Sequence, residues 1–407
     1  MTPTLQVRRI AHELEQAGLR RPSILEAGVA QVLNLAVSLR QIVIVWRAAN
    51  KGVRQHYGIT RSRQFLDLLR TVWHGNLMPR GYYFQRFFRQ PDPSAYLEVI
   101  DHRELQLLLR NIHCSANTTV LDDKSSFHDF CAKHGLPTPP ILAQYTNGRC
   151  EVSPSSDDAW KVDLFAKPAR SYSSRGIACW HYDSKRDQHT DGKQYLDRPA
   201  IREWLAAQSG ENCLIVQPRL ENSVDLAPIS AKALANCRVV TARSPDGNVI
   251  VLLAVLRMGV GEAITSDEPS KSFCTAINLE SGELGIADVK QAEQGSLTHH
   301  PESKALITGR KLSRWPEMKE MALRAHANLP QMIFVGWDVI DTNKGPMLLE
   351  GNVVWGGNLA QMAGNLPLGA TGFSEIFLHY HARGKPELTD REPEDVCGTL
   401  ALETLHD

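Results

Sequence analysis

Residues 334–352 read FVGWDVIDTNKGPMLLEGN, a pattern typical of two apolar strands joined by a tight turn. The turn falls on Asn-Lys-Gly at 343–345, where the glycine can adopt the positive φ that short hairpin loops require. A three-residue loop of this kind places Asp338 directly opposite Glu350. Asn352 lies two residues beyond Glu350, so it shares the same face of the strand. The stretch therefore predicts three oxygen-bearing side chains on one face of a hairpin.

Two carboxylates that face each other across a ladder repel, and a hard cation is the usual remedy. Mg²⁺ with bound phosphates accepts one or two carboxylates and an amide oxygen, which matches this hairpin. The plainer alternative is a hairpin whose two acids face solvent. The apolar neighbours Val335, Trp337 and Val339 favour a mostly buried hairpin, in which unpaired acids would be costly.

The composition is that of a soluble globular protein large enough for two or three domains. The chain has 407 residues, of which 43% are hydrophobic and 22% charged, and its formal net charge is zero. The charge is uneven, because residues 1–110 carry 16 Lys and Arg against 8 Asp and Glu. This basic region could attract an anionic substrate, a carrier or a charged surface, although a solvated helical surface explains it more simply.

Several function classes find no support in the sequence. It holds neither a P-loop nor a dinucleotide-binding glycine motif. The aromatic cluster at 82–88 is expected to pack between helices, and no nucleic-acid partner is expected. The eight cysteines are scattered without metal-binding spacing, as in a reducing cytosol. We expect no secretory leader and no transmembrane segment, and hence a cytoplasmic protein.

Positively charged side chains occur singly on predicted strands. Lys167 ends an apolar strand at 164–168, and the small polar segment 169–176 could close over phosphates with its backbone N–H groups. Arg238 and Arg257 lie on the two arms of another predicted hairpin. A two-residue loop would place both arginines on one face, whereas a three-residue loop would turn Arg257 away. The sequence leaves this choice open.

The order of these motifs resembles the ATP-grasp superfamily and, more narrowly, its sugar-transfer-associated branch. The resemblance covers roughly residues 80–365. It rests on an Asp-Lys before a helix that ends in Gly-Leu-Pro-Thr-Pro (121–139), a second lysine strand (165–168), a Gln-Pro-Arg segment (216–220), two arginine strands (236–241 and 255–259) and the acid hairpin.

The resemblance implies an α+β protein with the ATP-grasp fold, in which two α+β subdomains sandwich ATP. A mainly helical region would precede them. The expected divisions are a helical region at 1–110, an ATP-grasp domain at 111–385 with lobes at about 111–215 and 216–385, and an acidic tail at 386–407.

The resemblance also implies a role for each matching residue. Two lysines would bind α- and β-phosphate oxygens, and a serine-rich loop would cover the phosphates. One segment would contact adenine, and an acid after it would bind the ribose. Two arginines would hold the transferred phosphoryl group, and the hairpin would carry two Mg²⁺ ions, which Mn²⁺ could replace. The lysines are Lys124 and Lys167, and the loop includes Ser173, Ser174 and Gly176. The adenine segment is Gln217, Pro218, Arg219 and Leu220, and the ribose acid is Glu221 or Asp225. The arginines are Arg238 and Arg257, and the Mg²⁺ ligands of the hairpin are Asp338, Glu350 and Asn352.

On this resemblance the expected activity is that of an ATP-dependent carboxylate–amine ligase. It would form an amide or peptide bond through an acyl phosphate and release ADP and phosphate. A phosphotransferase acting on a small molecule and a non-catalytic nucleotide-binding partner protein are the alternatives. The substrates would be a small carboxylic acid and an amine, and the basic N-terminal region is a candidate dock for a carrier protein or a dimer partner.

Two segments depart from the family pattern. The loop before Gly176 is rich in serine where the family has more glycine, so its mobility as a lid is open. Residues 266–269 read Ser-Asp-Glu-Pro where the family usually has Asp-Asn, which points to an unusual acceptor substrate.

Overall fold

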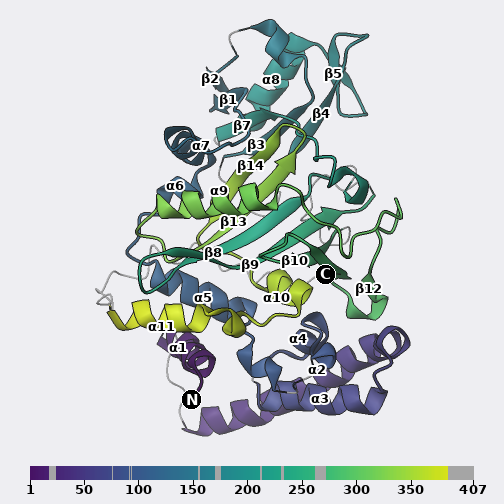
Figure 1. Ribbon diagram of the computed structural model, residues 1–407, viewed down its shortest axis with the longest axis vertical. Helices are drawn as coiled ribbons and strands as arrows, with labels where there is room; N and C mark the ends of the chain where they lie inside the picture. The colour runs from purple at the N-terminus through teal and green to yellow at the C-terminus, as the bar shows by residue number, and fades with distance from the viewer. Residues whose placement is uncertain are drawn as a thin grey trace.

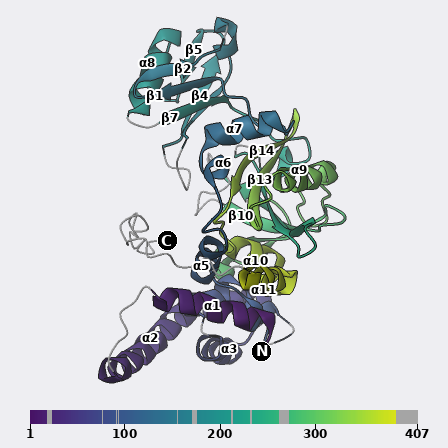
Figure 2. The same ribbon diagram turned by 90° about the vertical axis from the view of Figure 1, so that its left-hand side faces the viewer.

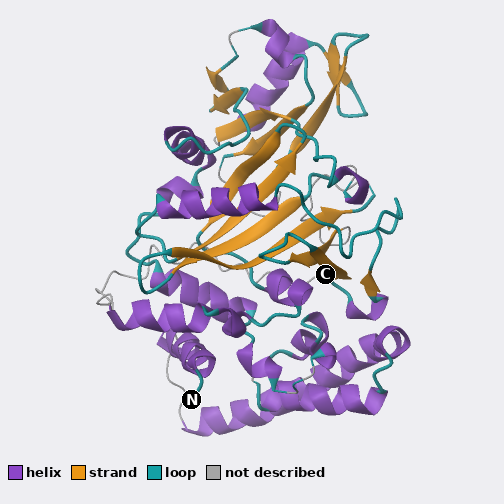
Figure 3. Cartoon of the chain, viewed as in Figure 1, coloured by secondary structure: helices purple, strands orange, loops and turns teal. Residues whose placement is uncertain are grey.

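The computed structural model describes residues 1–17, 24–75, 77–90, 92, 94–154, 156–169, 176–210, 213–230, 233–261 and 272–383, and the side chains of 24–37 are not part of this description. Figures 1, 2 and 3 show a helical part at one end of the molecule, a large sheet in the middle and a smaller sheet at the other end. Every pairing between named strands is antiparallel.

Local sequence signals account for the helices of the N-terminal part. The side chain of Thr60 accepts a hydrogen bond from the Arg63 N–H at the start of one helix, and Asp101 and Glu104 form a capping box at another. The 82–88 aromatics pack between these helices, as expected from the sequence. The elements are α1 (Pro3–Ala17), α2 (Ile24–Tyr57), α3 (Arg61–Trp73), α4 (Pro79–Phe84), α5 (His102–Ile112) and the 3₁₀ turns η1 (Phe87–Arg89) and η2 (Ala95–Glu98).

The first lobe is a seven-stranded sheet with the strand order β2-β1-β7-β3-β4-β5-β6. Its core is apolar and includes Trp160 and Trp180, which are almost fully buried. The strands are β1 (Ala143–Thr146), β2 (Arg149–Val152), β3 (Leu164–Pro168), β4 (Ala178–Asp183), β5 (Gln188–Thr190), β6 (Tyr195–Leu196) and β7 (Cys213–Pro218); the helices packed on it are α8 (Arg198–Ser209) and η3 (Asp157–Trp160). The preceding helices α6 (Thr119–Asp122) and α7 (Lys124–Lys133) pack in the core of the other, larger sheet, where Phe127 lies beside Trp337.

The second lobe is another seven-stranded sheet, with the order β12-β11-β10-β9-β8-β13-β14. One face packs on α9, and the other packs on α10, α11, α1 and α5, so α1 and α5 share a core with this sheet. The strands are β8 (Asn236–Arg243), β9 (Val249–Gly259), β10 (Ser272–Ile277), β11 (Leu284–Val289), β12 (Ser296–Leu297), β13 (Phe334–Thr342) and β14 (Gly345–Asn352); the helices are η4 (Ala227–Ile229), η6 (Ala292–Gln294), α9 (Trp315–Ala327), α10 (Asn358–Gly364), η7 (Leu368–Thr371) and α11 (Phe373–Arg383).

The register of the β13–β14 hairpin combines a shorter loop with a bulge. Thr342 pairs with Gly345, so the loop has two residues and the predicted three-residue loop is wrong. The register then shifts beyond Val339, which pairs with Leu348, while Asp338 pairs with Glu350. The extra residue in β14 restores the predicted pairing of the two acids. Bulges of this kind bend a strand and turn its side chains, and they are frequent beside active sites.

The β8–β9 hairpin also contains a register shift. Arg243 pairs with Val249 around the loop, which alone would turn Arg257 to the opposite face from Arg238. The register shifts between Val240 and Thr241, and beyond the shift Asn236 pairs with Arg257. Both arginines therefore lie on one face of the sheet, and a bulge resolves the choice that the sequence leaves open.

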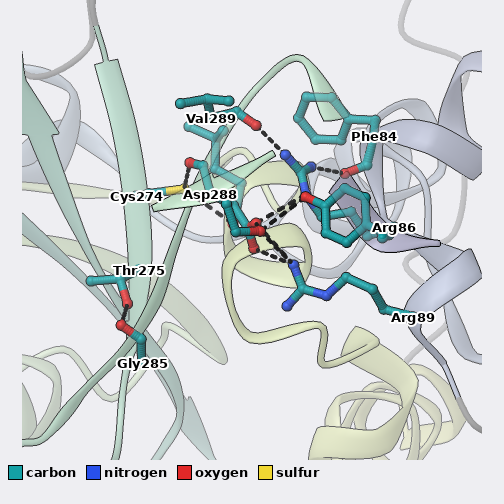
Figure 4. A network of polar contacts seen from close by, with 11 residues as sticks. Phe84, Arg86, Arg89, Cys274, Thr275, Gly285, Asp288 and Val289 are labelled. Carbon is teal, nitrogen blue, oxygen red and sulfur yellow. Dashed lines mark hydrogen bonds and ion pairs between the residues drawn. The ribbon is translucent and has the colours of Figure 1, made fainter. Parts of the chain in front are cut away.

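The N-terminal part is joined to the second lobe by a buried ion-pair network (Figure 4). The Asp288 carboxylate of β11 pairs with Arg86 Nε at 3.1 Å and with Arg89 Nη1 at 2.9 Å, and neither Arg86 nor Asp288 has exposed side-chain surface. Arg86 also donates hydrogen bonds to the carbonyls of Phe84 and Val289. Tyr57 and Ser296 share a hydrogen bond of 2.9 Å at the same boundary. The helical part is therefore fixed to the sheet by charge as well as by apolar contact.

Candidate active site

The acid hairpin meets both arginines at one end of the second sheet. Asp338 lies beside Arg238 on the neighbouring strand, since the two residues pair across the ladder. Its Oδ1 accepts hydrogen bonds from Arg238 Nε at 2.5 Å and from Arg257 Nη2 at 3.0 Å. Glu350 lies on the other side of Asp338, and Asn352 donates to the Glu350 carboxylate at 3.2 Å. The structure thus brings Asp338, Glu350, Asn352, Arg238 and Arg257 together.

The electrostatics of the two acids differ. Burial alone would raise the pKa of Asp338, but the guanidinium groups of Arg238 and Arg257 outweigh it and hold that pKa far below its usual range. Burial raises the pKa of Glu350, and the neighbouring Asp338 carboxylate raises it further, against the pull of three cations. Asp338 is therefore firmly ionised, while Glu350 takes up a proton more readily than a free glutamate.

Lys124 and Lys167 face this hairpin. Lys124 is the first residue of α7, and its Nζ donates to the carbonyl of Ala169, just beyond β3, at 3.2 Å. Lys167 lies on β3 and keeps some accessible surface, yet burial lowers its pKa to about 8. The Glu350 carboxylate opposes that shift and the Lys124 ammonium adds to it, so the three charges lie within range of one another. The acid pair thus lies within electrostatic range of the ammonium groups of Lys124 and Lys167 as well as of the two arginines.

The predicted adenine segment connects the two lobes. Gln217 and Pro218 end β7, and the Gln217 side chain donates to the Pro139 carbonyl at 3.1 Å. The Arg219 N–H donates to the Asp163 carbonyl at 2.7 Å, after which Leu220 leads toward the second sheet, where Asn222 bridges to Thr342. This course places residues 217–220 at the junction of the lobes.

The two candidate ribose acids have structural contacts of their own. Glu221 accepts a hydrogen bond from the Asn343 side chain at 2.9 Å, in the turn of the acid hairpin. Asp225 accepts two hydrogen bonds from Ser313, and these contacts lower its pKa. Of the predicted phosphate loop, Gly176 has a positive φ of 72° and lies against Pro168. Ser173 and Ser174 lie outside the described residues, as does the unusual segment 266–269.

Asn236 also belongs to the site, although the sequence predicted no role for this residue. It is 4% exposed, lies on the same face as Arg238 and Arg257, and hydrogen-bonds to Asp338. Its Oδ1 is buried and meets no hydrogen-bond partner among the described residues. Strand alternation places it on this face, two residues before Arg238, and that spacing is the signal that could have found it.

The donor set fits Mg²⁺ bound with phosphates. Carboxylate oxygens of Asp338 and Glu350 and the amide oxygen of Asn352 are hard ligands, and Mg²⁺ completes its shell with water and phosphate oxygens. The hydrogen bonds that Asn352 makes to described residues are donated by its nitrogen, which leaves the oxygen for a cation. No cluster of three His, Cys, Asp or Glu side chains occurs in the described part of the chain, so an all-protein cage for a softer metal finds no support there.

The family is shown by a comparison with protein-family models. Residues 105–371, about two thirds of the chain, match the family described as sugar-transfer associated ATP-grasp. This chain belongs to the sugar-transfer-associated ATP-grasp family. The resemblance seen in the motifs is confirmed, and with it an α+β ATP-grasp fold preceded by a helical region. The assignment supports an ATP-dependent ligase in general terms and ATP as the nucleotide.

Solved structures with partial similarity include several ligases. D-alanyl-alanine synthetase A from Vibrio cholerae is 17% identical, with 65% of this chain and 66% of that one covered and a TM-score of 0.39. A D-cycloserine synthetase is 13% identical (64% and 71% covered, TM-score 0.35), and the VanG D-Ala:D-Ser ligase from Enterococcus faecalis is 12% identical (64% and 61% covered, TM-score 0.37). These similarities are too low to bear on the substrate.

No curated protein matches the chain in sequence. Among the helices of the described residues, none combines the length and the apolar character needed to cross a membrane.

Proposed function

We propose that this chain is an ADP-forming ligase that joins a carboxylic acid to an amine through an acyl phosphate. A carboxylate oxygen of the acid attacks the γ-phosphorus of ATP, the bond from the γ-phosphorus to the bridging oxygen breaks, and ADP leaves. The amine nitrogen then attacks the acyl carbon, loses a proton, and displaces inorganic phosphate. Atoms and charge balance without an oxidant or reductant.

One observation carries the proposal: four cations from four separate elements surround two carboxylates. Lys124 comes from α7 and Lys167 from β3, and Arg238 and Arg257 come from β8 and β9. Phosphoryl transfer needs positioning and charge neutralisation more than covalent help from the protein, and this arrangement supplies both. When bound, Mg²⁺ would neutralise phosphate charge at Asp338, Glu350 and Asn352.

Asp338 positions both arginines of the site. Both guanidinium groups pair with the Asp338 carboxylate, which fixes their orientation. Arg238 is 12% exposed and Arg257 9%, so a phosphoryl group that they contact is largely shielded from water. We assign them the stabilisation of the transferred phosphoryl group and of the oxyanion that forms when the amine attacks.

The test is hydroxylamine trapping with ATP and a panel of amino, sugar and simple carboxylic acids. The proposal expects ADP and a hydroxamate with at least one acid, and no product from Asp338→Asn. Glu317→Gln, which alters an exposed carboxylate at the start of α9, is the matched control and should keep full activity. Release of AMP and pyrophosphate would refute the proposal. A stable product that retains the γ-phosphate without any amine would instead identify a phosphotransferase.

A further inference from the structure

A separate cavity lies within the N-terminal helical part. It has a volume of about 430 Å³ and is lined by side chains from α3, α4, η1 and η2. That volume falls in the range of small-molecule binding sites. Figure 1 places α3 and α4 at the end of the molecule opposite the first lobe, so the cavity is remote from the candidate active site. Neither the family fold nor the proposed reaction accounts for it.

Part of the cavity lining is apolar and aromatic, and it lies beside polar lining side chains such as Thr60, Thr71 and Gln90. The rings of Phe87 and Tyr96 meet edge to face with centroids 6.5 Å apart, and the Tyr82 ring lies 6.5 Å from Phe87. Leu66 of α3 also lines the cavity and is 55% exposed. These side chains offer contact area to an apolar body, and the aromatic rings hold their positions at little conformational cost.

The mouth of the cavity is positively charged. Arg63 and Arg70 of α3 lie on either side of Asp67, and each guanidinium approaches that carboxylate at 3.6 Å. At this distance each contact is an ion pair that is too long for a hydrogen bond, and among the described residues neither guanidinium group has a hydrogen-bond acceptor. One carboxylate faces two guanidinium groups that are 54% and 59% exposed, which leaves the mouth with excess positive charge.

The wall of the cavity is tied to the second lobe. Phe87 begins η1, and Arg89 at the end of the same turn pairs with the buried Asp288 of β11. Gln90, which also lines the cavity, donates to the Asn365 carbonyl at 2.7 Å. The cavity is therefore bounded by a segment with fixed partners on the ATP-grasp sheet, and its shape does not depend on α3 alone.

We infer that this cavity is a second ligand site, which takes a small organic anion with an aromatic or aliphatic body and pairs its acidic group with the guanidinium group of Arg63 or Arg70, the two cations that flank Asp67. The apolar walls exclude a compact inorganic anion as the best ligand, and the paired arginines disfavour a cation. A carboxylate and a phosphate share the chemistry required at the mouth.

The test uses the full chain and the aromatic sulfonate 8-anilinonaphthalene-1-sulfonate as a fluorescent probe. Saturable binding of one probe molecule per chain is expected, with unchanged affinity in saturating ADP and Mg²⁺. The double variant Arg63→Gln/Arg70→Gln should bind about tenfold more weakly, because charge-assisted hydrogen bonds are lost. Arg80→Gln, an exposed arginine of α4 outside the cavity, is the matched control.

Competition then identifies the acidic group. Displacement by decanoate supports a carboxylate ligand and displacement by decyl phosphate supports a phosphate, while decanol should compete much more weakly than either. Leu66→Glu places a carboxylate among the lining side chains at an exposed position and should abolish probe binding without loss of thermal stability. The inference is overturned if ADP displaces the probe, if the double arginine variant binds as tightly as the native chain, or if decanol competes as well as decanoate. Because ADP binding is measured in the same samples, failure of this site is distinguishable from failure of the nucleotide site.

Discussion

The protonation state of Lys167 should control ATP affinity between pH 7 and pH 9. Burial lowers the pKa of this lysine to about 8 in the ligand-free protein, with Lys124 adding to the shift and Glu350 and Asp338 opposing it. A triphosphate beside the ammonium favours the charged form and raises the pKa again. ATP therefore binds the protonated lysine, and affinity must fall as the pH rises through 8.

The magnitude follows from linkage. With a free pKa of about 8 and a higher bound pKa, apparent affinity falls about tenfold from pH 7 to pH 9, or about 1.4 kcal/mol. Lys167→Arg keeps the charge across this range, because arginine does not lose its proton there. The ATP affinity of this variant should therefore not show the tenfold loss between pH 7 and pH 9. Glu350→Gln removes a charge that supports the ammonium, so the midpoint of the profile should move to lower pH.

Calorimetry with ATP in metal-free buffer at pH 7, 8 and 9 measures the pH dependence of ATP affinity directly. Ionisation of ATP itself affects the native protein and the arginine variant equally, so the difference between their two profiles isolates the lysine. Parallel profiles for the two proteins would refute the argument, as would an affinity for the native chain that stays constant up to pH 9.

Three further predictions concern catalysis and stability. Glu350→Gln should lower Mg²⁺-dependent ADP formation at least about 100-fold, measured in a coupled assay, with Glu317→Gln unchanged; near-native activity in Glu350→Gln would remove this residue from the metal site. Burial lowers the pKa values of His113 and His326 to about 4, so the unfolded chain binds more protons below pH 6.5, and each histidine should cost about 2 kcal/mol of stability between pH 7.5 and pH 5 in urea denaturation. His113→Gln should show a shallower acid loss, and an unchanged slope would contradict this assignment. Asp288→Asn should lower the free energy of unfolding by about 3–5 kcal/mol, because it leaves two arginines near an uncharged amide, whereas Arg9→Gln at the exposed Arg9–Glu13 pair should cost no more than about 1 kcal/mol.

Much of the candidate site could be found from residue type and order alone. Asp338, Glu350 and Asn352 stand out because polar side chains interrupt apolar strands, and such positions rarely persist without partners. Lys167 and Arg238 stand out in the same way. Glu221 and Asp225 show the limit of this reasoning, since their bonds to Asn343 and Ser313 depend on segments distant in sequence. The proposed roles of all these residues remain predictions.

The attachment of the helical region could not be predicted from the sequence. Arg86 and Arg89 read as ordinary members of a basic, aromatic segment. Their partner, Asp288, lies about 200 residues away, and nothing local to either segment signals the pairing. The excess of positive charge in residues 1–110 is thus partly a structural charge that β11 neutralises.

The amino-acid sequence alone specifies which chemical groups the protein has and the order in which its strands present them. Strand alternation then fixed which neighbours share a face within each unbroken strand. The tertiary structure decided how the strands are placed against each other, because one residue more or less in a loop reverses every side chain beyond it. Leu349 of β14 and Leu252 of β9 supply that one residue in the two hairpins. Packing on both faces of the second sheet selects these bulges, since the alternative register would bury the arginines and acids in an apolar core and expose the core to water.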